Sequence, residues 1–382
     1  MSASAPIADA AAPAAATPGL LGTAARRALV ALGLILLGLL FLYGGDTWLS
    51  IVNATMIFAI AALGLNVLSG YAGQVSLGIA FFMAIGFYVA AWLGSAPPTS
   101  SFDRAGLGLS FLIWLPAAGV VAALVGALIG PAALRLKGFY LGIVSLALVV
   151  VGQHIFTNIK QIAPITGGPA GRSAAAPAFG DFSFSSPSAI AGVTLSKEQL
   201  FFILILLVLL LAGLFVGNVA RSRAGRAFQA VRDNEVGAVI MGVNLFEAKM
   251  GAFVLSSFLA GISGALYAGY RAYAIPDQWS LTFSVQFVAA IIIGGVASVW
   301  GSILGAAFVF AVPLVIQEFS VVPQTASSSG PSVGDLNTII YGVLILAFLL
   351  FEPAGVIGLI RRVQGWAQRL DSRRGKGGAP TS

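Results

Sequence analysis

Long stretches of the chain carry no charged residue and are separated by short groups of polar and charged positions. A helix needs about 20 apolar residues to cross the roughly 30 Å of hydrocarbon in a bilayer. Two stretches are long enough for two crossings each, so we expect about ten spans, or about eight or nine if one pair is re-entrant. The uninterrupted stretches are residues 28–45, 47–102, 105–134, 138–159, 199–220, 250–270, 278–317 and 336–351.

The composition agrees with a membrane protein. Hydrophobic residues make up 58% of the 382 residues and charged residues only 9%, whereas soluble domains carry about 25% charged residues. We therefore predict an all-α polytopic protein of the cell membrane, with the lipid bilayer as its surroundings. The net charge of +7 is better explained by the orientation of the spans than by a nucleic-acid partner, which we do not expect.

The Lys and Arg residues predict how the spans are oriented. With the N-terminus inside and ten spans threaded, 15 of the 20 Lys and Arg residues face the cytoplasm. Positive residues are enriched in cytoplasmic loops, so the sequence predicts that both termini are cytoplasmic. The five that then face outward are Arg104, Lys160, Arg172, Lys197 and Arg271.

Polar segments divide the chain into three parts. Residues 1–27 are rich in Ala, Pro, Ser and Thr, which predicts a disordered cytoplasmic tail. Residues 28–358 form the transmembrane domain, and residues 359–382 form a basic cytoplasmic tail. No small-residue cleavage site follows the first apolar run, so we interpret it as an uncleaved span, with a signal peptide as the alternative. The transmembrane domain contains an outer loop, 160–198, and a cytoplasmic segment, 219–248.

Catalytic and metal-binding chemistries lack their residues in this sequence. The chain has no Cys and a single His, His154, which leaves no thiol nucleophile and no Cys- or His-rich metal site. It has no GxxxxGK[ST] phosphate loop. No predicted span holds a carboxylate in its interior, whereas ion-coupled carriers commonly have one there. We therefore predict a permeation pathway and not an enzyme, with a secondary carrier and a non-transporting scaffold as alternatives.

Two stretches at predicted inner turns interrupt the apolar pattern with Gly and small polar residues: LNVLSGYAGQVSLG (65–78) and IIGGVASVWGSILG (292–305). Non-helical backbone at this depth is tolerated only when it is buried in protein or lines a water-filled cavity. We interpret both stretches as parts of one inner gate, with hinge glycines Gly70, Gly73, Gly78, Gly294, Gly295 and Gly301. Candidates for the substrate pathway are the uncharged hydrogen-bonding residues Asn66, Gln74, Ser76 and Ser145. Alternatively, these four side chains satisfy backbone groups freed at helix ends.

The cytoplasmic segment 219–248 is the long polar segment on the predicted inner face. Its apolar residues recur at helical spacing, so we expect one or two short amphipathic helices. It also mixes acidic and basic residues at 232–235, whereas a loop that only sets orientation needs only Lys and Arg. We interpret the segment as a docking surface for a chain that supplies energy, with ordinary positive-inside charge as the alternative.

Six sequence blocks, in this order, resemble the LivM-type permease of ABC importers for branched-chain amino acids. The resemblance covers nearly everything except the tails, but permeases for urea, short amides and aromatic acids share these patterns. The blocks are GYAGQVSLGIAFFMAIGFYVAA (70–91), RLKGFYLGIVSLAL (135–148), TGGPAG (166–171), GRAFQAVRDNEVGAVIMGVN (225–244), LSSFLAGISGALYA (255–268) and IIGGVASVWGSILGAAF (292–308).

The resemblance implies an ABC importer permease fold and a set of partners. These are a LivH-type permease, two ABC ATPase subunits and an external substrate-binding protein. ATP and Mg would be bound by the ATPases, so no cofactor is expected on this chain. The resemblance also places an ATPase-coupling motif in the cytoplasmic segment, with Gly237 in place of the family's first Ala. The residues assigned to coupling are Arg226, Arg232, Asp233, Glu235, Gly237, Ala238 and Gly242.

Overall fold

The computed structural model describes residues 38–96, 106–133, 139–179, 182–185, 187–190, 193–319, 342, 343 and 346. Both predicted tails and most of the first and last predicted spans lie outside these residues. The helices are α2 Asp46–Leu65, α3 Ile79–Gly94, α4 Phe111–Ala133, α5 Phe139–Asn158, α6 Ala163–Thr166, α7 Lys197–Arg221, α8 Arg223–Asp233, α9 Glu235–Ile240, α10 Leu245–Arg271, α11 Leu281–Gly294, α12 Val299–Ala306 and α13 Val312–Phe319. Shorter elements are the π-helices η1 Asn66–Tyr71 and η4 Ala307–Ala311, and the 3-10 turns η2 Gly168–Ala170 and η3 Pro276–Gln278.

Six helical runs of the described chain are long and apolar enough to cross a membrane. They are Asp46–Tyr71, Phe111–Pro131, Tyr140–Asn158, Lys197–Arg221, Leu245–Arg271 and Val299–Ile316. Helices α3 and α11 are shorter, with 16 and 14 residues. Each long charge-free stretch of the sequence contains two helical runs: α2–η1 and α3 in the first, α11 and α12–η4–α13 in the second.

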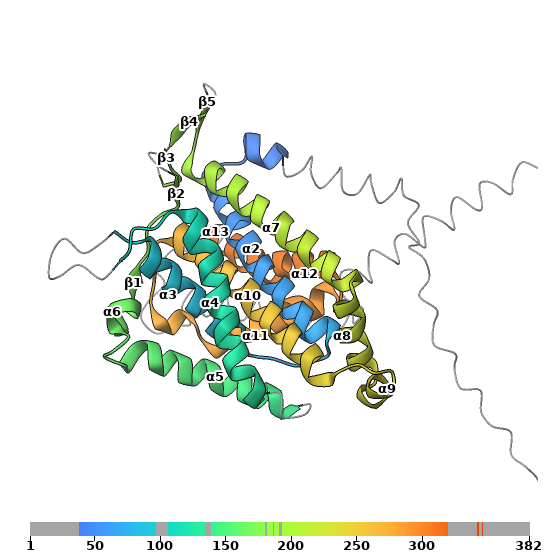
Figure 1. Ribbon diagram of the computed structural model, residues 1–382. Coiled ribbons are helices and arrows are strands. Elements are labelled where there is room, and N and C mark those ends of the chain that lie inside the picture. Colours follow the sequence, from blue (N-terminus) through green and yellow to red (C-terminus); the bar gives the residue numbers. More distant parts are fainter. Residues whose placement is uncertain are drawn as a thin grey trace, which may run out of the picture.

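Helix α10 lies at the centre of the bundle and packs against α2, α3 and α4 (Figure 1). Close approach of these helices depends on Gly residues. A Cβ added at Gly64 of α2 would lie 2.9 Å from the Leu259 Cβ of α10, and one added at Gly119 of α4 would lie 2.8 Å from the Ile262 side chain. Small residues let helices approach closely in a bilayer, where dispersion contacts must replace the hydrophobic effect.

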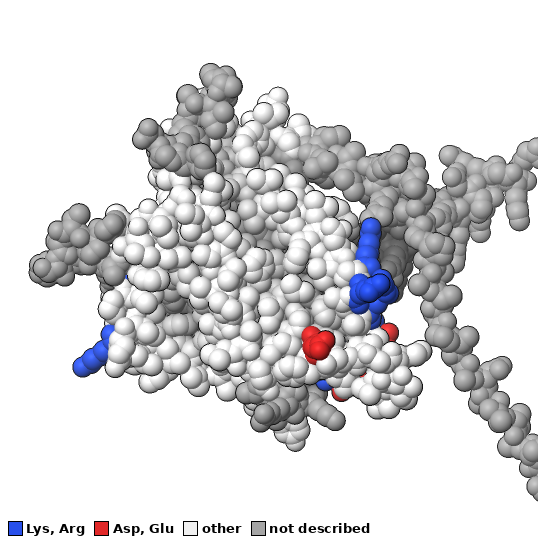
Figure 2. Space-filling view, viewed as in Figure 1, with Lys and Arg blue, Asp and Glu red and all other residues white. Residues whose placement is uncertain are grey.

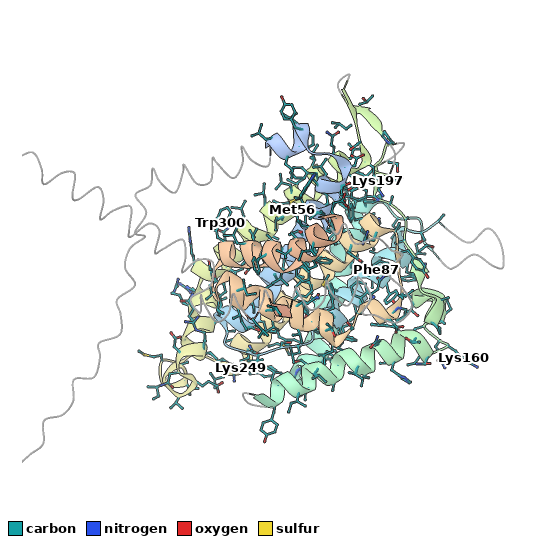
Figure 3. The ribbon with its side chains drawn as sticks, turned by 180° about the vertical axis from the view of Figure 1, so that it is seen from behind. Met56, Phe87, Lys160, Lys197, Lys249 and Trp300 are labelled. Atoms are coloured by element: carbon teal, nitrogen blue, oxygen red, sulfur yellow. The ribbon has the colours of Figure 1, made fainter. Side chains whose placement is uncertain are left out.

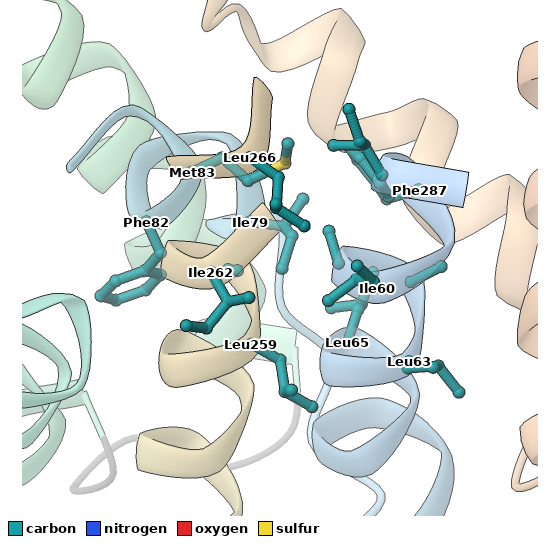
Figure 4. Packing of buried hydrophobic residues seen from close by; sticks show 14 of the residues in the cluster. Ile60, Leu63, Leu65, Ile79, Phe82, Met83, Leu259, Ile262, Leu266 and Phe287 are labelled. Atoms are coloured by element: carbon teal, nitrogen blue, oxygen red, sulfur yellow. The ribbon is translucent and has the colours of Figure 1, made fainter. Parts of the chain in front are cut away.

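The buried core lies between α2, α3, α10 and α11 (Figure 4). Of the 18 most apolar consecutive residues in the α2–η1 run, 89% are buried inside the protein. The corresponding share for α4 is 33%. Leu63, Met83 and Phe287 have no exposed surface. Helix α2 is therefore apolar all round because protein surrounds it, whereas α4 keeps an apolar face at the molecular surface.

Charged side chains gather at two ends of the molecule, and uncharged residues form the surface between them on the face shown in Figure 2. Helices α8 and α9 mark one end, and α6 and β1 lie at the other (Figure 1). Lys249 and Lys160 lie at these opposite ends in Figure 3, whereas Met56 and Phe87 lie between them. We call these two ends the α8 end and the α6 end.

The α6 end contains short antiparallel ribbons that the all-α prediction did not include. The pairs are β1 Arg172–Ser173 with β6 Tyr273–Ala274, β2 Ala178–Phe179 with β3 Phe182–Ser183, and β4 Ser188–Ile190 with β5 Val193–Leu195. The guanidinium of Arg172 is buried and donates to the carbonyls of Pro164, Ile165 and Ala91. This side chain therefore ties the polar segment to α3 and α6.

Candidate functional site

The first break consists of residues 66–78, between α2 and α3. It opens with the π-helix η1, whose wide turn places the Ala72 N–H 3.2 Å from the Val67 carbonyl. The Ser69 hydroxyl donates to the Gln74 carbonyl at 2.8 Å, which closes the turn. Gly73 has φ +68°, a left-handed conformation that favours glycine. π-Helical turns occur frequently at functional sites.

Backbone amides freed at the start of α3 bind side chains from other helices. Ser145 of α5 accepts from the Leu77 N–H at 2.8 Å, and Ser284 of α11 accepts from the Ala80 N–H at 3.2 Å. Ser76 accepts from the Gly78 N–H at 3.3 Å. Ser76 and Ser145 therefore bind backbone donors freed at a helix end, which is the alternative to a place in the substrate pathway. Buried backbone donors need such partners.

The second break consists of residues 294–298, between α11 and α12. Gly295 has φ +113° and Ala297 has φ +59°, so both depart from helical backbone. Ser298 then caps α12 by accepting from the Gly301 N–H at 3.2 Å. A Cβ added at Gly294 would lie 3.0 Å from the Gly305 Cα, so only glycine allows α11 and α12 to meet here.

Asn66 joins the two breaks. Its Nδ2 donates to the Ser298 carbonyl at 2.9 Å and to the Ser302 hydroxyl at 2.7 Å. Its Oδ1 accepts from the Ala297 N–H at 2.9 Å. The side chain has 0% exposure, and a Cβ added at Gly70 would lie 2.7 Å from the Ala297 nitrogen. Two stretches more than 230 positions apart in the sequence are therefore in direct contact.

The α8–α9 segment, Arg223–Ile240, forms a compact projection at the α8 end. Ser222 caps α8 and Asn234 caps α9, each by accepting from the N–H three residues later. Helix α8 turns Phe228 and Val231 into the protein, as its predicted amphipathic pattern requires.

Helix α9 presents an apolar surface to the outside. Val236 is 70% exposed, Ile240 80% and Met241 85%, whereas Ala238 is buried. Gly242 follows with φ +81°, which ends the helix in a left-handed C-terminal turn. The amphipathic pattern predicted the short helices, but it did not indicate that this apolar face lies outward.

One direct polar contact, and a second path through Lys249 of α10, connect the α8–α9 segment to the first break. Arg232 Nη1 donates to the Gly70 carbonyl at 3.0 Å, and a Cβ added at Gly73 would lie 2.6 Å from the Arg232 Cγ. Glu235 forms an ion pair with Lys249 of α10 at 2.5 Å, and Gln74 Nε2 donates to the Lys249 carbonyl at 3.1 Å. A cavity of about 210 Å³ lies between these contacts and is lined by residues from both sides.

The structure brings together many of the residues assigned from the sequence. Gly70 and Gly73 of the first break contact Arg232 in the last turn of α8. Asp233 pairs with Arg232 at 2.9 Å. Arg226 is exposed and donates to the Arg221 carbonyl at 3.1 Å, apart from the breaks. Gly237 and Ala238 lie on α9, and Gly78 and Gly301 lie at the starts of α3 and α12.

Several contact residues were not predicted. Lys249, Ser284, Ser298 and Ser302 all bind residues of the breaks or of α9. From the sequence, Lys249 is only one of the 15 Lys and Arg residues expected on the cytoplasmic side. Ser298 and Ser302 have one signal in the sequence, since they lie within the Gly-rich stretch 292–305, whereas nothing in the sequence marks Ser284.

Sequence comparisons relate the chain to permeases of known transport systems. A family described as "Branched-chain amino acid transport system / permease component" matches residues 47–349. The high-affinity branched-chain amino acid transport system permease protein LivM of Salmonella typhimurium is 29% identical over 324 residues, which is 81% of this chain and 70% of that protein. The protein of the same name from Escherichia coli K12 is 28% identical over 359 residues, 90% of this chain and 78% of its own length.

A more distant similarity extends to the other permease type. A probable branched-chain amino acid transport permease protein LivH from Methanocaldococcus jannaschii is 26% identical over 163 residues, which is 43% of this chain and 49% of that protein. No solved structure gives a significant match. The family relationship therefore rests on the sequence matches, which cover both breaks and the α8–α9 segment.

Proposed function

Because the chain belongs to the family of permease components of branched-chain amino acid transport systems, we propose that it forms the membrane pathway for branched-chain amino acids in an ATP-driven importer. The family match over residues 47–349 carries this proposal. It is a multi-pass protein of the inner membrane and a transport subunit. ATP and Mg would be bound and used by partner ATPases, and an external binding protein would deliver the substrate.

The proposed orientation places the α8 end in the cytoplasm. Arg221, Arg223, Arg226, Arg232 and Lys249 all lie toward this end, on α7, α8 and the start of α10. Cytoplasmic loops carry an excess of Lys and Arg, so this end is the better candidate for the inner face. About ten spans with both termini inside fit this orientation, and most of the first and last of these spans lies outside the described residues.

The exposed apolar face of α9 supports docking of an ATPase. Val236 and Ile240 lie on the short helix α9 at the projecting end of the bundle, and Met241 caps its C-terminus. Exposed apolar clusters rimmed by polar residues mark protein interaction sites, and an amphipathic helix commonly binds by placing its apolar face in a groove. A second permease of LivH type would complete the pathway, in keeping with the similarity to such a protein.

Docking can be tested by placing a charge on this face. Ile240→Asp should abolish co-purification of the ATPases, whereas Tyr43→Asp should not, because Tyr43 is equally exposed (82% against 80%) but lies before α2, near the opposite end. Equal ATPase recovery with both variants would contradict the docking surface.

Substrate class can be tested by uptake in bacterial cells that lack every other branched-chain amino acid importer. Cells with this chain and its partners should take up labelled leucine, and unlabelled isoleucine and valine should compete. Urea, short amides and aromatic acids are the alternative substrates within the same importer class. Competition by one of these, with none by isoleucine or valine, would assign the importer to that substrate instead.

A further inference from the structure

We propose that Asn66 and Arg232 are positioning residues that make the α8–α9 segment and the two breaks move as one unit. Arg232 transmits movement of the segment to the first break, and Asn66 transmits it from the first break to the second. This inference rests on the proposed function, since it takes the α8–α9 segment as the place where an ATPase acts. It also gives Asn66 a different role from that of a substrate ligand.

The contacts of Asn66 carry the first part of the proposal. The side chain of Asn66 forms hydrogen bonds to Ala297, Ser298 and Ser302, all outside its own helix. A polar side chain buried among apolar helices needs partners, and here each partner lies in or next to the second break. The first break therefore cannot move away from the second without breaking all three bonds, whose donors and acceptors are buried or half-buried.

Glycine contacts strengthen this joint. A Cβ at Gly70 would overlap the Asn66 side chain and would lie 2.7 Å from the Ala297 nitrogen. The backbones of the two breaks are thus in close contact at Gly70 and Ala297. A Cβ at Gly294 would overlap the backbone at Gly301, so α11 and α12 are also tightly packed on the two sides of the second break. Packed interfaces of this kind shift between discrete arrangements and do not deform continuously.

The contacts of Arg232 carry the second part. Its Nε and Nη2 bind the carboxylate of Asp233 at 3.0 and 2.9 Å, which fixes the guanidinium plane against α8. Its remaining Nη1 donates to the Gly70 carbonyl near the end of η1. A cation at a helix C-terminus stabilises the carbonyls left without partners there. The aliphatic part of the same side chain packs directly on Gly73.

A second connection runs in parallel through α10. Glu235 at the start of α9 binds Lys249, whose backbone carbonyl accepts from Gln74 of the first break. The α8–α9 segment is therefore connected to the first break on both sides of Gly73, directly at Gly70 and through Lys249 at Gln74. Tilting of the segment would displace residues 70–74 together, and Asn66 would pass the displacement to residues 297–302.

The test measures how many leucine molecules are transported per ATP hydrolysed by the complete importer in proteoliposomes. Asn66→Leu keeps the approximate volume of the side chain but removes its three hydrogen bonds, and Arg232→Lys keeps the charge but removes the planar fork. Both should lower the transport-to-hydrolysis ratio by about fivefold or more, because losing a typical coupling free energy between two sites has an effect of this size. The ATPases should remain bound and active. A wild-type ratio in either variant overturns the proposal.

A matched control and a rescue make the result specific. Thr55→Ala removes a buried hydrogen bond inside α2, from the Thr55 hydroxyl to the Ile51 carbonyl, and touches neither break nor either connection, so its ratio should stay at the wild-type value; a fall as large as that of Asn66→Leu would overturn the proposal. The chain has no Cys, so an Asn66→Cys/Ser302→Cys double variant can be bridged by a short thiol-specific cross-linker. Bridging should restore the ratio, and an unchanged low ratio in bridged protein contradicts the proposal.

The same experiment separates failure of this inference from failure of the proposed function. If wild-type protein neither binds the ATPases nor transports leucine, the proposed function fails. If wild-type protein transports leucine and the variants couple normally, only the inference fails. Should Asn66→Leu not assemble, Arg232→Lys decides the outcome, because that side chain lies at the surface with 37% exposure.

Discussion

Gly73→Ala tests the contact between the α8–α9 segment and the first break. Gly73 has φ +68°, and a non-glycine residue in this region costs roughly 1–2 kcal/mol. The added Cβ would also lie 2.6 Å from the Cγ, 3.1 Å from the Cβ and 3.2 Å from the Cα of Arg232. Since the Cα cannot rotate away, the last turn of α8 must shift, and overpacking of this kind costs about 1–3 kcal/mol.

The expected destabilisation is therefore about 2–5 kcal/mol, the sum of these two effects. Gly168→Ala is the matched control, because Gly168 has a similar φ of +59° but its nearest atom would lie 3.5 Å from the new Cβ. Only the conformational cost of roughly 1–2 kcal/mol applies there. Denaturant titration of the purified variants in detergent measures the free energy of unfolding of each, and so gives both destabilisations.

A double-mutant cycle isolates the contact with Arg232. Arg232→Ala removes the Cγ that lies closest to the new Cβ, so combining it with Gly73→Ala should relieve part of the overlap. We expect the two changes together to cost about 1–2 kcal/mol less than the sum of the single changes. Strictly additive costs, or equal costs for Gly73→Ala and Gly168→Ala, would refute the reasoning.

Three further predictions concern other contacts. Glu235→Arg replaces the ion pair with Lys249 by a like-charge contact, so leucine uptake should be lost while membrane insertion, measured by the amount of chain in the membrane fraction, stays normal. Ser145→Ala leaves the Leu77 N–H without its hydroxyl partner, which should cost about 1–3 kcal/mol in denaturant titration without changing the KM for leucine uptake; a raised KM would instead favour a place in the substrate pathway. Arg172→Met removes the donor that holds three carbonyls at the α6 end and should destabilise the chain by about 3 kcal/mol or more, detected as a lower midpoint in the same titration.

The apolar pattern predicted most of the helical architecture, because the signal for a membrane helix is local. The two longest charge-free stretches contain helix pairs, and each divides at the Gly-rich segment that had been singled out. The ribbons of the α6 end were not predicted, since strands of two or three residues are too short for an alternating pattern. The number of spans and the side on which the termini lie remain predictions.

The functional contacts were less accessible from the sequence, because they join distant segments. The sequence pairs the two Gly-rich stretches as one gate, but nothing near Asn66 indicates which residues of the second stretch it binds, and Lys249 resembles one more orientation charge. Helical spacing predicted α9 but could not show that Val236 and Ile240 face outward, since periodicity does not say which face neighbouring helices cover. The roles assigned to the site residues therefore remain predictions, although the structure now supplies the contacts by which to test them.

The central claim is that this chain provides the pathway of an ATP-driven importer of branched-chain amino acids. The most direct measurement is uptake of labelled leucine by proteoliposomes that contain this chain, its partner permease and both ATPases, with the binding protein outside and ATP inside. Leucine should accumulate only when the chain, the binding protein and ATP are all present. Uptake that continues at the same rate without ATP, or without this chain, would contradict the account.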